Sequence, residues 1–394
     1  MKKRLFILQT LHCALPLAVL AAPGTPKFRS VDVDTKVEIG YGVAVADVNG
    51  DKKPDILLAD KSLYVWYENP SWTKHVMAER VTRIDHVCLA AQDIDQDGKC
   101  EVAVGAGWNP SDTVNSGAVF FLKAPAERSE RWEPVVLPHE PTVHRMRWVK
   151  NAAGSHDLIM VPLHGRGNKA ATGEGAGVRI IAYHRPADPN GTWATDVLDE
   201  TLHKTHNFDP VQWDADPEQE LLVASMEGVF LLDRQGPSGR LTQLSGNESG
   251  GAGEVRLGRL DKGRRFFATV EPMHGTNLVV YTEPAAKTGN GWWSRRVLDS
   301  SLVDGHALAC GDFSGRGGDQ IVVGWRAMGK PGARVGIKLF TAGDSEGQEW
   351  SHVLVDDNTM ACEDLCLADL NGDGRLDIVA AGRATRNLKI YWNE

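Results

Sequence analysis

Short apolar segments alternate with polar loops rich in Gly, Asn and Asp along most of the chain. The clearest case is the last stretch, where apolar runs at 365–370, 376–381 and 388–392 are separated by two such loops. Runs of this length and composition, bounded by turn-forming residues, are typical of β-strands. The pattern therefore predicts an all-β protein built from many short strands.

The same arrangement occurs seven times. Besides the unit at 363–394, good copies lie at 43–60 and 89–106, a divergent copy lies at 308–325, and weak copies lie at 146–163, 210–225 and 255–270. The units begin, at spacings of 45 to 62 residues, near Tyr41, His86, His144, His206, Glu254, His306 and Glu363. Self-similarity at such a period indicates a repeat architecture, in which each unit buries its apolar faces against its neighbours.

A further strand follows in most units, and its segments begin with Trp at 72–79, 132–138, 193–199, 292–299 and 350–356. The last unit has no such segment before Glu394, whereas an alternating segment at 28–37 precedes the first unit. We expect this N-terminal strand to complete the last unit, because that closes a ring and removes exposed sheet edges. The sequence thus predicts one domain over residues 23–394, a seven-bladed β-propeller of four-stranded blades.

Residues 1–22 combine a positively charged start, an apolar run and small residues at Ala21 and Ala22, which is typical of a secretory signal. We therefore expect a secreted or periplasmic protein. No later apolar run approaches the roughly 18 residues of a membrane helix, so no membrane span is predicted. The net charge of −9 argues against nucleic acid as a partner. The five cysteines after residue 22 are an odd number, and no disulfide framework is predicted from them.

The loop after the first strand of a unit carries the most specific local signal. Residues 369–377 read Asp-x-Asn-x-Asp-Gly-x-x-Asp, which offers oxygen ligands at positions 1, 3, 5 and 9 for a hard cation such as calcium. Strands rather than helices flank the loop, and position 12 is Ala380, so it is not an EF-hand. The predicted calcium ligands are Asp47, Asn49, Asp51, Asp55, Asp93, Asp95, Asp97, Glu101, Asp369, Asn371, Asp373 and Asp377. These loops fall on the bottom face of the expected ring, so we assign calcium a stabilising role.

The opposite, top face collects histidines and arginines. It carries the connections between blades and the loops between the second and third strands of each blade, and six of the 13 histidines map to it. The predicted catalytic residues are Tyr41, His86, His144, His164, His206 and His306. The predicted substrate-binding residues are Arg166, Glu254, His274, Trp325, Arg326, Glu363 and Arg383. Arg145 lies beside this set without a predicted role.

Several imidazoles at one channel mouth provide a general acid and a general base near neutral pH. Arginines hold a carboxylate or stabilise an enolate as it forms. This combination suits a carbon–oxygen lyase or dehydratase, which removes a proton next to a carbonyl and then a β-leaving group, on a keto-sugar or a uronate. Alternatively, the same imidazoles with Glu254 or Glu363 hold a second divalent metal, zinc or magnesium. A carboxylate pair for glycoside hydrolysis also stays open.

The chain shows two resemblances, the first of which concerns the fold and the second also the activity. The acidic repeats at 47–58, 93–104 and 369–380 resemble the FG-GAP (VCBS-like) repeats of integrin-type and bacterial secreted propellers. Other phrases resemble the propeller domain of aldos-2-ulose dehydratase and its single-domain bacterial relatives, namely WYENP (66–70), HGRG (164–167), GRRFFATVEPMHG (263–275) and GRATRNLKIYWNE (382–394). The second resemblance implies loss of water from keto-sugars such as 1,5-anhydro-fructose and glucosone. The cupin domains of the fungal enzyme have no counterpart in this chain.

The alternative function is a propeller that binds a glycan or a protein partner without chemistry, as the integrin-type resemblance allows. The 12 Trp residues fit sugar binding, but we expect most of them to pack between blades. A binding face exposes aromatic platforms, and the top face offers Tyr41, Trp108 and Trp325. A catalytic pocket instead concentrates titratable groups, which favours chemistry on a carbohydrate. The oligomeric state stays open.

Overall fold

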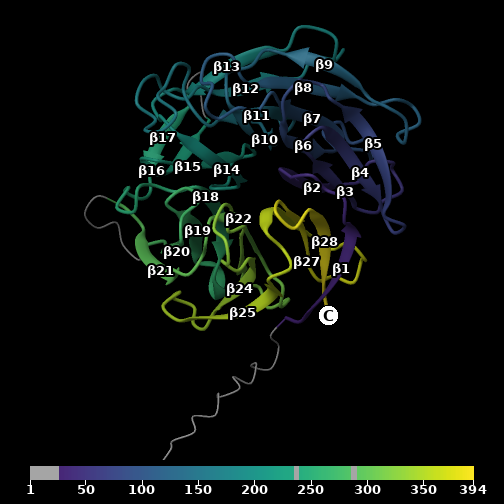
Figure 1. Cartoon of the computed structure of the whole chain (residues 1–394). Coiled ribbons are helices and arrows are strands. Elements are labelled where there is room, and N and C mark those ends of the chain that lie inside the picture. Colours follow the sequence, from purple (N-terminus) through teal and green to yellow (C-terminus); the bar gives the residue numbers. More distant parts are fainter. Residues whose placement is uncertain (1–25, 235–238, 285–290) are drawn as a thin grey trace, which may run out of the picture.

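The computed structural model describes residues 26–234, 239–284 and 291–394. The segment 1–22, predicted to be a secretory signal, lies outside these residues. The described residues form 28 strands and one short 3₁₀ turn, η1 (Asp261–Gly263). The strands make seven four-stranded antiparallel sheets arranged as a ring around a central axis (Figure 1). The predicted seven-bladed β-propeller is confirmed.

Strands are added from the axis outwards in each of the first four blades. The first blade contains β2 (Gly42–Ala46), β3 (Asp55–Ala59), β4 (Leu63–Glu68) and β5 (Thr73–Glu79). The second contains β6 (His86–Gln92), β7 (Glu101–Ala106), β8 (Ala118–Lys123) and β9 (Glu133–Leu137). The third contains β10 (Val143–Lys150), β11 (His156–Pro162), β12 (Ile180–His184) and β13 (Ala194–Asp199). The fourth contains β14 (Thr205–Val211), β15 (Glu220–Ser225), β16 (Gly228–Asp233) and β17 (Arg240–Gln243).

The last blade closes the ring with the N-terminal strand. The fifth blade contains β18 (Glu254–Arg259), β19 (Arg265–Glu271), β20 (Asn277–Thr282) and β21 (Ser294–Asp299). The sixth contains β22 (Gly305–Gly311), β23 (Gln320–Trp325), β24 (Gly336–Ala342) and β25 (Trp350–Asp357). The seventh contains β26 (Cys362–Ala368), β27 (Asp377–Gly382), β28 (Asn387–Asn393) and β1 (Phe28–Asp34). β1 pairs antiparallel with β28, from Phe28 opposite Asn393 to Asp34 opposite Leu388, which confirms the predicted closure.

The core lies between blades. Every residue of β3 is buried, because the two faces of this strand pack against different neighbours. Ile56 and Leu58 join an apolar cluster with the seventh blade, whereas Leu57 and Ala59 join a cluster with the second blade. Side chains alternate between the two faces of a strand, so one short apolar run serves two interfaces. This explains why the inner strands lack the polar alternation of half-exposed strands.

The acidic loops follow the ends of the innermost strands. Asp47 and Asp369 use both carboxylate oxygens to accept backbone N–H groups of their own loops. In the second blade, Asp93, Asp95 and Glu101 each bring one oxygen within 4.8 Å of the others. A loop that the sequence pattern ranked as a weak copy makes a similar group from Asp214, Asp216 and Glu220. Calcium in these loops stays a prediction.

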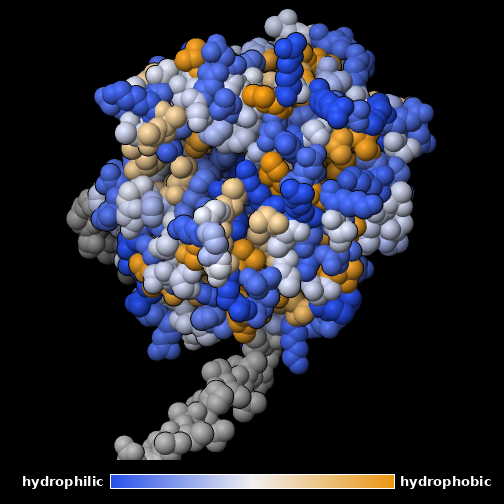
Figure 2. Space-filling model, in the orientation of Figure 1, coloured by the Kyte–Doolittle hydropathy of each residue, from blue (hydrophilic) through white to orange (hydrophobic). Residues whose placement is uncertain are grey.

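Within the described part of the chain, no helix is long and apolar enough to cross a membrane. Its five cysteines are free thiols: Cys88, Cys100, Cys310, Cys362 and Cys366. Figure 2 shows one face of the molecule, which is largely hydrophilic with scattered apolar residues.

Deletion of residues 26–34 from a chain that starts at residue 26 tests the closing strand. The deletion removes β1 and exposes the edge of β28, so we expect the melting temperature to fall by on the order of 10 °C. Differential scanning calorimetry of the two chains measures the change. An unchanged melting temperature would show that closure contributes little to stability.

Chelation tests the calcium prediction. A cation that binds only the folded state stabilises it by mass action, so EDTA is expected to lower the melting temperature and excess calcium to restore it. Asp93→Asn combined with Asp95→Asn should reduce the calcium-dependent part of the shift. The same melting temperature in EDTA and in calcium would contradict calcium binding by these loops.

Candidate functional site

A cavity of about 570 Å³ lies at the end of the channel where the innermost strands begin. This end is opposite the acidic loops, which follow the other ends of the same strands. Nine of the thirteen predicted top-face residues line the cavity: Tyr41, His144, His164, His206, His274, His306, Arg326, Glu363 and Arg383. The structure therefore brings most of the predicted site together, from six of the seven blades.

A repeated backbone irregularity aims side chains into this cavity. In five innermost strands the pairing with the next strand slips by one residue near its start, as in a β-bulge. The five extra residues are Val87, His144, His206, His306 and Glu363, and all of them line the cavity. A bulge leaves one residue out of the ladder and redirects its side chain.

Three of the bulge residues are histidines, and each is anchored to the next blade. His144 donates its Nδ1–H to the carbonyl of His206 at 2.6 Å, and His206 donates to the carbonyl of Gly253 at 2.9 Å. His306 likewise donates from Nδ1 to the carbonyl of Glu363. A carbonyl only accepts, so Nδ1 carries the hydrogen in each ring. Burial, followed by nearby arginine charge, lowers the pKa of all three imidazoles, which leaves Nε2 unprotonated in each ring.

His274 reaches the same group from the loop after β19. Its backbone adopts a φ of +57°, a conformation that is uncommon for a residue with a side chain and is found often at functional sites. The Nε2 atoms of His274 and His206 lie 2.9 Å apart. His206, His274 and His306 each offer one ring nitrogen within 4.8 Å of the others. Metal-bound histidines usually donate their other ring N–H to a carbonyl, as His206 and His306 do, so this group fits a divalent metal.

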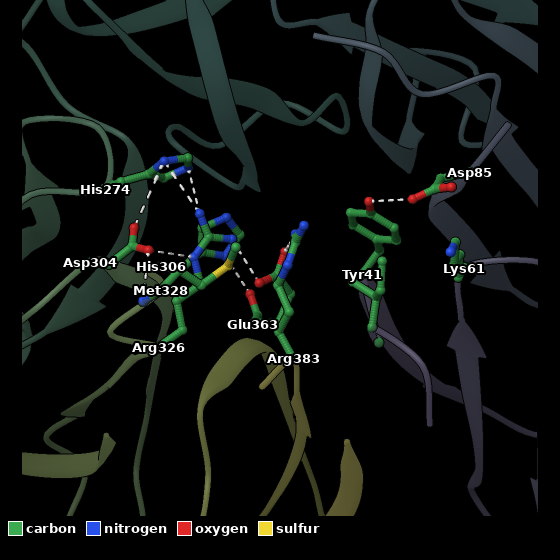
Figure 3. A network of polar contacts seen from close by, with 12 residues as sticks. Tyr41, Lys61, Asp85, His274, Asp304, His306, Arg326, Met328, Glu363 and Arg383 are labelled. Atoms are coloured by element: carbon green, nitrogen blue, oxygen red, sulfur yellow. Dashed lines mark hydrogen bonds and ion pairs between the residues drawn. The ribbon is translucent and has the colours of Figure 1, made fainter. Parts of the chain in front are cut away.

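An ion-pair network borders the histidines (Figure 3). Glu363 accepts from Arg326 Nη1 at 2.6 Å through one oxygen and from Arg383 Nη1 at 3.0 Å through the other. Arg326 also places Nε 3.1 Å from Asp304 Oδ2. Both arginines are thereby fixed beside the cavity, and the Glu363 carboxylate is fully engaged in binding them.

Tyr41 lies beside the Arg383 end of this network. Its hydroxyl donates to Asp85 at 2.8 Å, and the Arg383 guanidinium lies 5.1 Å from its ring centroid. Burial, strengthened by the bond to Asp85, raises the pKa of Tyr41, so the phenol stays protonated at neutral pH.

Two predicted residues miss the cavity because of strand register. His86 is the residue before the bulge in β6, so Val87 faces the cavity in its place. The His86 ring is fully buried and stacks on Tyr64 at 4.2 Å between centroids. β18 has no bulge, and Glu254 instead accepts from the Asn207 side chain at 2.6 Å, with its other oxygen 3.1 Å from His206 Nδ1. Glu254 therefore lies beside His206 but does not line the cavity.

Two other predicted residues form hydrogen bonds with the loops around the cavity. Trp325 is buried at the end of β23 and donates its indole N–H to the carbonyl of Arg334 at 2.7 Å. Arg166 is half-exposed, donates to the carbonyl of Val114 at 2.9 Å and lies 3.2 Å from Glu140. Neither lines the cavity, so the structure does not support substrate binding by them. Sequence position placed them on the correct face but could not show which way they point.

Among the charged residues that line the cavity, Lys204 was missed. It lies two residues before His206, and its backbone forms an isolated β-bridge with His164. Burial, with the Lys204 charge as a second cause, lowers the pKa of His164 to about 4. His164 begins the HGRG segment, in which Gly165 is required by a close approach: a Cβ there would lie 2.1 Å from the carbonyl oxygen of Ala176. The repeat pattern identifies histidines at the starts of blades, but it gives no signal for a lysine in a connecting segment.

Residues 116–284 match the profile of the family described as aldos-2-ulose dehydratase, beta-propeller domain. Over that stretch the chain is similar to a dehydratase propeller domain. The match covers less than half of the 394 residues and includes His144, His164, Lys204, His206 and His274. It confirms the predicted resemblance over these blades. A search of curated proteins found no match.

Solved structures with similar folds show the propeller architecture and nothing further about function. A chain in the crystal structure of a mitotic checkpoint complex is 14% identical, with a TM-score of 0.58 and coverage of 99% of this chain and 98% of that chain. BBS1N, crystallised with ARL6DN, is 16% identical, with a TM-score of 0.56 and coverage of 94% and 97%. The Myceliophteria thermophila Cps50 (Swd1) propeller domain is 11% identical, with a TM-score of 0.54 and coverage of 93% and 100%.

Glu363→Gln tests the ion-pair network. Removing the negative charge leaves buried Arg326 without its closest partner, so we expect a loss of about 3 kcal/mol in the free energy of unfolding. Urea unfolding followed by tryptophan fluorescence measures this loss. Asp357→Asn, which breaks an exposed pair with Arg334, serves as the control and should cost less than about 1 kcal/mol. Equal effects of the two substitutions would contradict a structural role for Glu363.

Proposed function

We propose that this protein is a carbon–oxygen lyase that removes water or another β-leaving group from an oxidised sugar in the histidine-lined cavity. The observation that carries the proposal is the convergence of anchored imidazoles, with Nε2 unprotonated, beside two arginines held by one carboxylate. The match to a dehydratase propeller domain over 116–284 supports the same class of reaction.

The chemistry follows from the protonation states. The neutral imidazole of His144, with its hydrogen held on Nδ1, accepts a proton at Nε2 from the carbon next to the substrate carbonyl. The C–H electron pair forms an enolate, which the positive charges of Arg326 and Arg383 stabilise. The enolate then expels the β-oxygen substituent as its C–O bond breaks. The leaving oxygen takes up the proton that His144 removed, so a β-hydroxyl departs as water, a conjugated enone remains and His144 is neutral again.

The group formed by His206, His274 and His306 would hold a divalent metal ion. Imidazole nitrogens suit zinc better than magnesium, which prefers oxygen ligands. When bound, zinc supplies a Lewis acid that polarises a carbonyl oxygen. The protein holds these three side chains in place through the carbonyls of Gly253 and Glu363 and through contacts of His274 with Arg326.

A propeller that binds a sugar without chemistry is expected to expose aromatic side chains in its binding site. Tyr41 and Trp108 line the cavity, but Trp108 stacks on His144 at 4.9 Å and Trp325 is buried elsewhere. Titratable groups outnumber aromatic ones among the described lining residues. The balance therefore favours chemistry over passive sugar binding.

Elimination activity is tested by ultraviolet absorbance between about 230 and 265 nm, where conjugated enones and unsaturated uronates absorb. The substrates are 1,5-anhydro-fructose, glucosone, 3-keto-glucosides and uronate polysaccharides. We expect an absorbance increase that falls by a factor of 100 or more in His206→Ala, on the order of the loss of an acid–base or electrostatic group.

His352→Ala is the matched control, because His352 is exposed on the outer strand β25. Metal analysis of the purified proteins gives a second measurement: His206→Ala should lose bound zinc, whereas His352→Ala should keep it. A flat absorbance trace with every substrate would contradict the lyase proposal and favour the binding alternative.

A further inference from the structure

The cavity carries more positive charge than its own carboxylates balance. Among the described lining residues, four are cationic, and they are Arg145, Lys204, Arg326 and Arg383. The carboxylate that lines the cavity, Glu363, is shared by Arg326 and Arg383, and Asp304 adds a second contact to Arg326. Arg145 and Lys204 have no carboxylate oxygen within 4.0 Å in the part of the chain that the structure describes.

Arg145 is a buried guanidinium that makes no direct ion pair, although the buried carboxylates Glu254 and Asp364 interact with its charge at longer range. It follows His144 in β10 and is only 3% exposed. One of its nitrogens, Nη1, donates to the carbonyl of His144 at 3.3 Å, and Nε has no hydrogen-bond partner. Burying an unpaired charge is costly, so such a group is expected to meet an anion in the functional state.

Lys204 supplies a second positive charge at the same cavity. Its backbone is fixed by the bridge to His164 and by the N–H of Met226, which donates to the Lys204 carbonyl at 2.9 Å. Lys204 is half-buried, and its amine makes no hydrogen bond to the described residues. The two unpaired cations therefore border one cavity in a chain whose net charge is −9.

We propose that the ligand of this cavity carries a carboxylate, so that the oxidised sugar is a sugar acid whose carboxylate is bound by Lys204 and Arg145. That this sugar acid undergoes elimination rests on the proposed function. That its carboxylate is bound by the two cations does not. Charge-assisted hydrogen bonds to a carboxylate would satisfy both cations at once. Neutralising a carboxylate also makes the neighbouring C–H more acidic, which assists proton removal by an imidazole.

A neutral sugar leaves both cations unpaired after it has displaced their water. Hydrogen bonds to charged groups contribute more than neutral ones, so we expect the acid to bind about tenfold to a hundredfold more tightly than a neutral sugar of the same shape. Added salt should weaken this preference, because part of the attraction is electrostatic and the cavity is open to solvent.

The test uses the whole protein and two probes that differ only at one carbon, D-glucuronate and D-glucose. Isothermal titration calorimetry measures the affinity of each probe for the wild type, Lys204→Met, Lys204→Arg and Lys169→Met. Lys204→Met should reduce the preference for glucuronate at least tenfold, and Lys204→Arg should retain it. Lys169→Met is the control: Lys169 is exposed and pairs with Glu174 at 2.7 Å outside the cavity lining, so the preference should not change.

The outcomes separate this inference from the proposed reaction. Equal affinity for the two probes, a preference for glucose, or no binding of either would overturn the inference. Elimination from neutral 1,5-anhydro-fructose, with no preference for glucuronate, would overturn it while leaving the lyase proposal intact. Binding of glucuronate that depends on Lys204, with no elimination from any substrate, would uphold the carboxylate site and overturn the lyase proposal.

Discussion

Contact between neighbouring blades is the constraint on which the rest of this structure depends. No blade buries its own apolar faces; Ile56 and Leu57, adjacent in β3, serve interfaces with two different blades. The ring must therefore close, and the pairing of β1 with β28 completes the last blade. Closure sets the distance between innermost strands across the axis, and that distance determines what can meet at the mouth of the channel.

The β-bulges in the innermost strands direct side chains into the cavity. Each anchored histidine lies in one blade and donates to a backbone carbonyl of the next: His144 to His206, His206 to Gly253, and His306 to Glu363. The carbonyls fix both the tautomer and the orientation of the rings, so the side that faces the cavity is the unprotonated Nε2. The protonation pattern of the site is thus a consequence of how blades pack, and not of the histidines themselves.

Charge inside the cavity opposes the net charge of the whole chain. The four lining cations lie within a protein of net charge −9, and low-dielectric walls preserve their field. Glu363 holds Arg326 and Arg383 in place, whereas Arg145 and Lys204 line the cavity without a direct ion pair to the described residues. One part of the charge therefore organises the site, and the other part is the basis of the proposed preference for anions.

The sequence by itself determined the architecture, because strand periodicity, the acidic loop repeat and the segment at 28–37 are local signals that repeat along the chain. It also placed the histidines on one face, since the start of each repeat maps to one end of the ring. It could not separate His144 from His86, because a one-residue slip of register decides which side chain faces the channel. Only the tertiary structure showed that Glu254 lies beside His206 outside the cavity lining and that Lys204 lines the cavity, because both depend on contacts between segments that are distant in the chain.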